Sequence, residues 1–238
     1  MSEALRRLLD DLREKGPGYV LSSRAAGLRQ RLYVLWLRLS RGRRTFEVGG
    51  RSYRYFFHGY RETWRTERTV EVPWALAAVR AHGGADVLEV GNVLSHYARF
   101  PHEVVDKYEA GPGVLNQDVV DFAPGKRYGL IVTISTLEHV GWDESPRDPQ
   151  KVRRAVERLK GLLAPGGALL ITLPLGWHSE VDRWLFESPS DFGELRFLKR
   201  VSAENEWREV PGAEAQGTRY GEPFEYANAV ALVAIRRP

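Results

Sequence analysis

The sequence predicts an α/β protein with a mostly parallel central sheet that helices cover on both faces. Apolar runs of strand length occur at 86–90, 129–134 and 168–173, and they are nearly continuous, as in strands buried on both sides. Segments with helical periodicity precede the first run, around 73–82, and separate the last two, at 148–163. Because parallel neighbours require crossover connections, this alternation favours a doubly wound sheet.

An N-terminal extension of helices and a β-hairpin is predicted ahead of this sheet. Residues 3–15 and about 20–41 have helical patterning, and four leucines recur at helical spacing in the second segment: Leu28, Leu32, Leu35 and Leu39. Gly49-Gly50, inside the segment 45–57, suits the positive φ angles of a tight two-residue turn. We favour a helix that docks on its own domain with a solvated arginine face. Contact with a membrane surface is the alternative.

Capping and breaking residues predict where the core elements begin and end. Pro73 suits the first turn of a helix that runs to about His82, and Gly83-Gly84 ends it. Asp148 as N-cap and Pro149 at the first position predict the start of a second core helix. Further strands are expected at 103–106, near 114–120, at 195–201 and at 228–235, with loops at 176–192 and at about 211–224.

Charge divides the chain at about residue 70. Residues 1–70 hold 16 Arg and Lys against 7 Asp and Glu, a net charge of +9, whereas residues 71–238 hold 19 against 24, a net charge of −5. We therefore predict a basic extension over 1–70 and an α/β domain over 71–238. The basic part favours peripheral contact with an anionic surface such as phosphate, lipid headgroups, glycan or RNA.

Composition excludes several classes of protein. The 238 residues include no cysteine, so no disulfide, thiolate metal site or cysteine nucleophile is possible. The N-terminus mixes charges through its apolar positions, unlike a signal peptide, and no apolar run approaches the length of a membrane span. These features favour a cytoplasmic protein. No metal site is expected, because no two of the following histidines have metal-ligand spacing: His96, His102, His139 and His178.

The segment from Asp86 to Glu109 contains the strongest functional signal. Its first apolar run stops at Gly91, and its second ends on Asp106. In a nucleotide-binding βαβ unit, an acidic side chain at the end of the second strand can hydrogen-bond a ribose diol. The sequence therefore predicts a nucleotide-like ligand at the carboxyl ends of these strands.

Three features together resemble the class I S-adenosylmethionine-dependent methyltransferases. Glu89-Val90-Gly91 matches the start of their first glycine motif, and Asp106 matches the acid after their second strand. Residues 130–140 (LIVTISTLEHV) and 158–174 (RLKGLLAPGGALLITLP) are similar to their fourth strand, the following helix and the Pro-Gly-Gly turn into the fifth strand. The resemblance covers about 71–175. It implies a Rossmann-like fold with an antiparallel closing strand and S-adenosyl-L-methionine as cofactor.

The resemblance also implies roles for the matched residues. Glu89 and Gly91 would border the methionine part of the cofactor, Asp106 would bind the ribose, and Asp118 would lie beside the adenine. The segment 135–139 would face the transferring methyl group. The residues implied in cofactor binding are Glu89, Gly91, Asn92, Asp106, Lys107, Asp118, Val119 and Ser135.

Glu138 and His139 are the candidate catalytic residues. Methyl transfer to oxygen or nitrogen requires that the acceptor's proton be removed, and histidine titrates near neutral pH. Glu138 could orient His139 or line the pocket. The alternative is that His139 only hydrogen-bonds a loop backbone and that Glu138 is an ordinary carboxylate at the start of a helix.

Three further groups of residues are candidates with weaker signals. Residues expected at the rim of the pocket are Trp142, Asp143 and Glu144. Two residues after the apolar run at 168–173 could meet an acceptor or belong to an ordinary polar loop: His178 and Asp182. The segment 57–73 is rich in aromatic residues and arginine and could cover the cofactor, which singles out Tyr60, Arg68 and Glu71.

The chain departs from the family pattern in two ways. The family's glycine loop continues with two more glycines, which let the backbone approach the ligand, whereas this chain has Gly91-Asn92-Val93-Leu94-Ser95. Glu89 and Asp106 are only 17 positions apart, so the helix between them is shortened. The leading hypothesis is a methyltransferase acting at oxygen or nitrogen of a small molecule, glycan or lipid-linked precursor. The alternatives are a non-catalytic binding or scaffold protein and, less favoured, an RNA methyltransferase.

Overall fold

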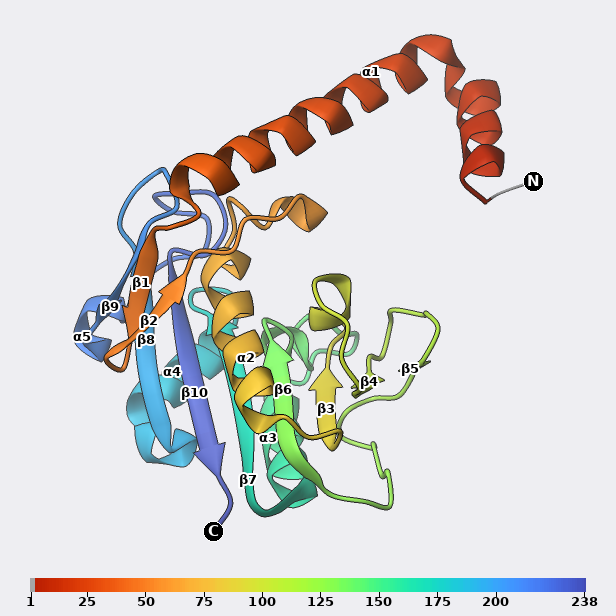
Figure 1. The fold of residues 1–238 in the computed structure, drawn as a ribbon. Coiled ribbons are helices and arrows are strands. Elements are labelled where there is room, and N and C mark those ends of the chain that lie inside the picture. The colour runs from red at the N-terminus through yellow and green to blue at the C-terminus, as the bar shows by residue number, and fades with distance from the viewer. Residues whose placement is uncertain (1–2) are drawn as a thin grey trace.

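An eight-stranded sheet of order β5-β4-β3-β6-β7-β10-β8-β9 forms the centre of the computed structural model, which describes residues 3–238 (Figure 1). Neighbouring strands from β5 to β7 pair in parallel, whereas β10 runs antiparallel to both β7 and β8. The predicted Rossmann-like fold with an antiparallel closing strand is confirmed, and β9 adds a second antiparallel pairing at the edge. The strands are β3 (Val87–Val90), β4 (Glu103–Val105), β5 (Val114–Leu115), β6 (Tyr128–Ile134), β7 (Leu163–Pro174), β8 (Glu194–Arg200), β9 (Trp207–Val210) and β10 (Ala229–Arg236).

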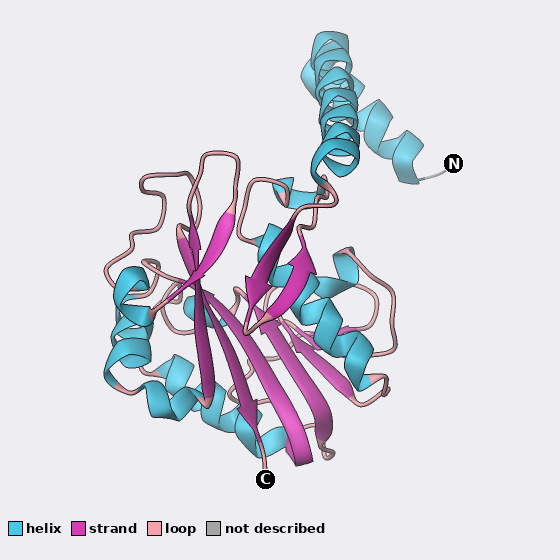
Figure 2. Cartoon of the chain, turned by 60° about the vertical axis from the view of Figure 1, so that its left-hand side comes forward, coloured by secondary structure: helices cyan, strands magenta, loops and turns pink. Residues whose placement is uncertain are grey.

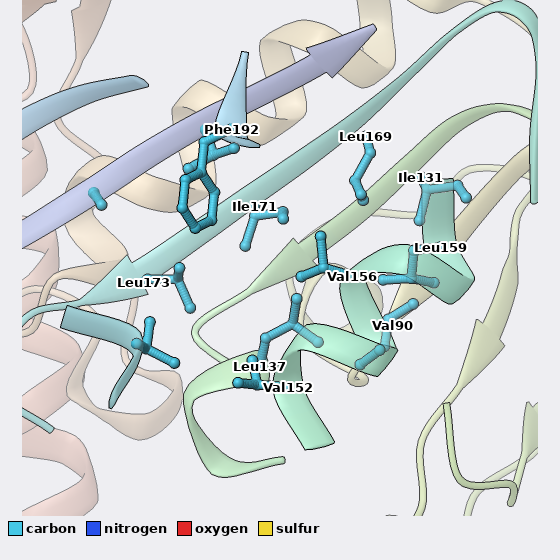
Figure 3. Close-up of a cluster of buried hydrophobic side chains, with 14 of the residues drawn as sticks. Val90, Ile131, Leu137, Val152, Val156, Leu159, Leu169, Ile171, Leu173 and Phe192 are labelled. Atoms are coloured by element: carbon cyan, nitrogen blue, oxygen red, sulfur yellow. The ribbon is translucent and has the colours of Figure 1, made fainter. Parts of the chain in front are cut away.

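Helices cover both faces of this sheet (Figures 1 and 2). One face packs against α2 (Arg68–His82), and the other packs against α3 (Lys151–Leu162) and α4 (Ser179–Glu187). The spacing in α3 explains its orientation, because Val152, Val156 and Leu159 lie on one side of the helix and are buried. Figure 3 shows these side chains pointing toward the strands that carry Ile131 and Ile171.

Both core helices begin at positions that differ from the prediction. Pro73 does not open α2, which begins five residues earlier. The carbonyl that lacks a donor because of Pro73 is that of Thr69, and it accepts the N–H of Phe56 instead. In the same way α3 begins at Lys151, after a turn in which the Asp148 side chain accepts the N–H of Gln150 at 3.2 Å. A tertiary contact and a local turn therefore override the proline signals.

The N-terminal segment forms α1 (Glu3–Arg41), which projects from the body of the molecule (Figure 1). Gly16 has φ 80° and ψ 165°, so two helical segments meet there, close to the predicted break. A hairpin of β1 (Thr45–Val48) and β2 (Arg51–Arg54) follows, and both glycines of its turn have positive φ, as predicted. Phe46 and Val48 of the hairpin are buried against Leu198 and Trp207.

Several elements were not expected from the sequence. The predicted loop at 176–192 contains α4, and the helical turn α5 (Gly212–Ala215) lies within the predicted loop at 211–224. The strand expected near 114–120 is only two residues long. Between β3 and β4 only one turn of 3₁₀ helix forms, η2 (Leu94–His96), as the short spacing predicted. The division of the chain at residue 70 stays a prediction, and among the described residues no helix is long and apolar enough to cross a membrane.

Candidate functional site

A cavity of about 600 Å³ lies at the carboxyl ends of β3, β4 and β6. This is the edge at which open α/β sheets bind ligands, and the volume lies within the range of small-molecule sites. Of the residues implied by the family resemblance or by the candidate chemistry, those lining the cavity are Gly91, Asn92, Asp106, Lys107, Asp118, Val119, Ser135 and His139. Glu89 and Glu138 do not line it.

Glu89 lies beneath the loop that follows β3. Its Oε1 accepts the N–H of Val93 at 2.7 Å and also that of Leu94, and its Oε2 lies 2.9 Å from Nε2 of His102. The other ring nitrogen of His102 donates to the carbonyl of Phe100 at 2.8 Å. Burial disfavours the charged ring, but these bonds outweigh it and raise the pKa of His102. The hydrogen bonds of Glu89 therefore fix the loop and link it to His102, an arrangement that we call the Glu89 clamp. Direct contact of Glu89 with a ligand stays a prediction.

Gly91 is required by the close approach of Thr136, in the turn that follows β6. Its φ is 82°, and a Cβ atom at this position would lie within 2.7 Å of the Thr136 side chain. Val93 and Leu94, in the loop that lacks the family's further glycines, do not close the cavity above it. Leu94 is fully buried in the core, and Val93 packs against the same cluster while lining the cavity.

Two carboxylates stand together at the end of β4. Asp106 accepts the backbone N–H groups of Asn92, Tyr108 and Glu109 at 2.7–3.1 Å, which leaves its oxygens about one further acceptor position. The Glu109 carboxylate accepts the Asn92 side-chain amide at 2.6 Å and lies 2.8 Å from Nε2 of His96. Glu109 also lines the cavity, and sequence reasoning missed it because its place is set by the turn after β4.

A cluster of two acids and two lysines forms the wall beyond β4. The ammonium groups of Lys107 and Lys151 each lie 2.5–3.0 Å from the carboxylates of Asp118 and Glu144. Burial opposes ionisation of both acids, yet the lysines lower the pKa of Asp118 and of Glu144. The hydrogen bond to Asp118 in turn raises the pKa of Lys107. The two ammonium groups and the two carboxylates therefore form one ion-paired cluster whose formal charges cancel. Lys151 was not expected here.

A second cavity of about 370 Å³ adjoins the first. The residues that line both are Arg61, Arg68, Ser135 and His139. Its remaining wall combines buried carboxylates with aromatic side chains from two loops: Glu67, Glu138, Trp177, Tyr220 and Tyr226. The side chains shared by both cavities therefore lie where two bound molecules would meet.

His139 lies between the two cavities and is held by a neighbouring acid. Its Nδ1 lies 2.5 Å from Oδ2 of Asp143, and its Nε2 lies 3.6 Å from Oε1 of Glu138. The ring meets Trp177 edge to face at 5.3 Å. Asp143 therefore occupies Nδ1–H and leaves Nε2 directed toward the cavities, an arrangement suited to accepting a proton.

Three buried acids surround a single arginine behind His139. Glu67, Glu71 and Glu138 are all buried, and Arg68 lies 3.7 Å from Glu71 while donating to the Ile134 carbonyl at 2.8 Å. Burial raises the pKa of Glu71 to about 7 and raises that of Glu138 well above its usual value. Among the described residues, one oxygen of Glu71 and one of Glu138 have no hydrogen-bond partner. A ligand group in the second cavity could satisfy the Glu138 oxygen.

The predicted acceptor residues His178 and Asp182 instead organise the loop between β7 and α4. Nδ1 of His178 accepts the N–H of Val181 at 3.3 Å, and burial lowers its pKa to about 4. Asp182 accepts the N–H of Gly176 at 2.9 Å. Neither residue lines the two cavities, so the alternative that they belong to an ordinary polar loop fits better. Within residues 3–238 no cluster of His, Asp and Glu could hold a metal ion.

Neither models of known protein families nor the curated proteins match this chain. Solved structures similar to it are S-adenosylmethionine-dependent methyltransferases. The N-methyltransferase NodS from Bradyrhizobium japonicum WM9, in complex with S-adenosyl-L-homocysteine, has 14% identity and a TM-score of 0.40 over 72% of this chain and 91% of that chain.

Two more neighbours are equally distant. The magnesium protoporphyrin IX methyltransferase ChlM from Synechocystis PCC 6803, with bound S-adenosylmethionine, has 12% identity and a TM-score of 0.39 over 70% of this chain and 78% of that chain. The sugar N-methyltransferase KedS8 from Streptoalloteichus sp ATCC 53650 has 13% identity and a TM-score of 0.38 over 75% and 92%.

Proposed function

We propose that this chain is an S-adenosylmethionine-dependent methyltransferase that methylates oxygen or nitrogen of a small molecule, glycan or lipid-linked precursor. One observation carries the proposal: a cofactor-sized cavity at the carboxyl ends of β3, β4 and β6 adjoins a second cavity, and His139 lies between them. A two-substrate transfer needs this arrangement, because the two reacting groups must be held in line.

The first cavity has suitable groups for the cofactor. Gly91 lines the cavity at the end of β3, and the carboxylates of Asp106 and Glu109 would accept the ribose hydroxyls. Asp118 and Val119 would flank the adenine. When bound, the cofactor supplies a methyl group on a positively charged sulfur, which the nearby carboxylates favour electrostatically.

The second cavity would hold the acceptor. Nε2 of His139 would take the proton from the acceptor's O–H or N–H while the cofactor supplied the methyl group to that oxygen or nitrogen. Asp143 holds the ring and stabilises the imidazolium that results. Glu138, with an unpartnered oxygen, would bind a donor group of the acceptor.

Isothermal titration with S-adenosyl-L-homocysteine tests the cofactor site. We expect saturable binding to the native chain and binding about 10–100-fold weaker in Asp106→Asn, because the amide cannot accept as many hydrogen bonds from the diol. The exposed Asp121→Asn is the matched control and should bind normally. If the native chain gave no heat at millimolar ligand, the scaffold alternative would replace the proposal.

His139→Ala tests the general base. Transfer of tritiated methyl groups from S-adenosylmethionine to a small-molecule extract of the source cells should fall by roughly 10²–10⁴-fold, with the affinity for S-adenosyl-L-homocysteine unchanged. Asp143→Asn should reduce transfer less, since the histidine remains. Full transfer by a folded His139→Ala protein would rule out this residue as the base.

Glu71→Gln tests the protonation of the buried acids. A carboxyl whose pKa is about 7 when folded but near 4.5 when unfolded holds its proton more tightly in the folded state. Its contribution to the free energy of unfolding is therefore largest below about pH 4.5 and is lost as the pH rises toward 7, by on the order of 2–3 kcal/mol.

Urea unfolding between pH 5 and 8 measures this contribution. The loss of stability over that range should be smaller in Glu71→Gln than in the native chain, and it should be unchanged in the exposed control Glu47→Gln. An identical pH dependence in all three proteins would mean that Glu71 is ionised throughout.

A further inference from the structure

The second half of α1 is fixed to the body of the molecule along one face only. Val34 and Leu37 are buried against Phe57, and the Gln30 side chain donates to the carbonyl of Gly59 at 3.0 Å. Arg38 donates to the carbonyl of Phe57 at 2.8 Å. These contacts set the rotation of the helix, and so they also determine which side chains point away from the body.

The opposite face of α1 is apolar and exposed. We define this outer face by Leu21, Leu28, Leu32, Leu35 and Leu39. Their exposed fractions run from 51% at Leu35 to 79% at Leu39. With 100° per residue, these positions fall within about 60° of one another and roughly opposite Val34 and Leu37. Isolated exposed leucines are common, but a continuous row of five along one helix indicates an interaction surface.

Arginines flank this outer face, and the same stretch of chain contains no acidic residue to balance their charge. Residues 16–46 contain seven arginines and neither Asp nor Glu. Arg24 and Arg31 lie along one edge of the outer face, and Arg29 lies near the other. Trp36, half exposed, sits beside the leucines on the second edge. Leucines and an aromatic ring between arginine rows are typical of helices that lie flat in the headgroup region of a membrane.

We propose that the outer face of α1 binds an anionic lipid surface. Its charge argues against a second copy of the chain as the occupant, because an antiparallel pair joined through the leucines would place the row of Arg24 and Arg31 against itself. An anionic bilayer satisfies both features at once, since it buries the leucines and neutralises the arginines. This proposal is independent of the proposed methyl transfer.

Docking in this way would bring the two cavities close to the membrane. The segment under α1 continues into Tyr60 and Arg61, which line the first cavity, and Arg61 also lines the second. Figure 1 shows α1 at the end of the molecule toward which β3 and β6 point. An acceptor carried on a lipid would then reach the site without leaving the surface.

Vesicle flotation of the full chain tests the proposal. The native chain should float with vesicles of phosphatidylcholine and phosphatidylglycerol in equal parts, and binding should drop at least tenfold with phosphatidylcholine alone or in 0.5 M salt. Leu28→Glu/Leu35→Glu should lose binding at least tenfold, whereas Val201→Glu, at an exposed apolar residue outside α1, should not. Arg24→Gln/Arg31→Gln should lose most of the preference for the anionic lipid.

Circular dichroism and the melting temperature establish that each variant is folded. Equal flotation of the native chain and a folded Leu28→Glu/Leu35→Glu variant would overturn the proposal. A native chain that fails to float would also overturn it. In that case a dimer that the variant abolishes would indicate a second copy of the chain as the partner, and a monomer would indicate an acidic protein.

Discussion

The Glu89 carboxylate fixes the loop on which the candidate site depends. It accepts two successive backbone N–H groups after β3 and is balanced by His102, whose ring also donates to the chain entering β4. This clamp lets Leu94 turn into the core, so a loop without the usual glycines still leaves space above Gly91. A buried charged group lowers stability unless its hydrogen bonds are complete. Here the hydrogen bonds of Glu89 and His102 link β3 to the chain that enters β4, and both strands border the cavity.

Electrostatic balance is organised differently in the two cavities. In the first, Lys107 and Lys151 form ion pairs with Asp118 and Glu144, and these pairs lower the pKa of both acids. In the second, the partly buried Arg68 lies 3.7 Å from Glu71, and burial raises the pKa of Glu71 to about 7 and that of Glu138 well above its usual value. The first cavity is therefore preorganised for a polar ligand, whereas the charge of the second depends on what enters it.

Sequence patterns predicted the elements whose signals are local. Apolar runs located β3, β6 and β7, Gly49-Gly50 located the hairpin turn, and the acid at the end of β4 located Asp106 in the cavity wall. Positions set by distant contacts were missed. Pro73 lies inside α2 because Phe56 supplies the missing hydrogen bond. Glu109 reaches the site from the turn after β4, and Lys151 from the first residue of α3, whose start was predicted two residues too early.

We propose that the space above Gly91 is a cofactor site and that the hydrogen bonds of Glu89 keep it open. A crystal structure of the native chain grown with S-adenosyl-L-homocysteine tests it most directly. We expect ligand density between Asp106 and Asp118, with the sulfur directed toward His139. Val93 and Leu94 should keep the positions that they have in the present structure. A cavity that stays empty at saturating ligand, or that Val93 fills, would contradict it.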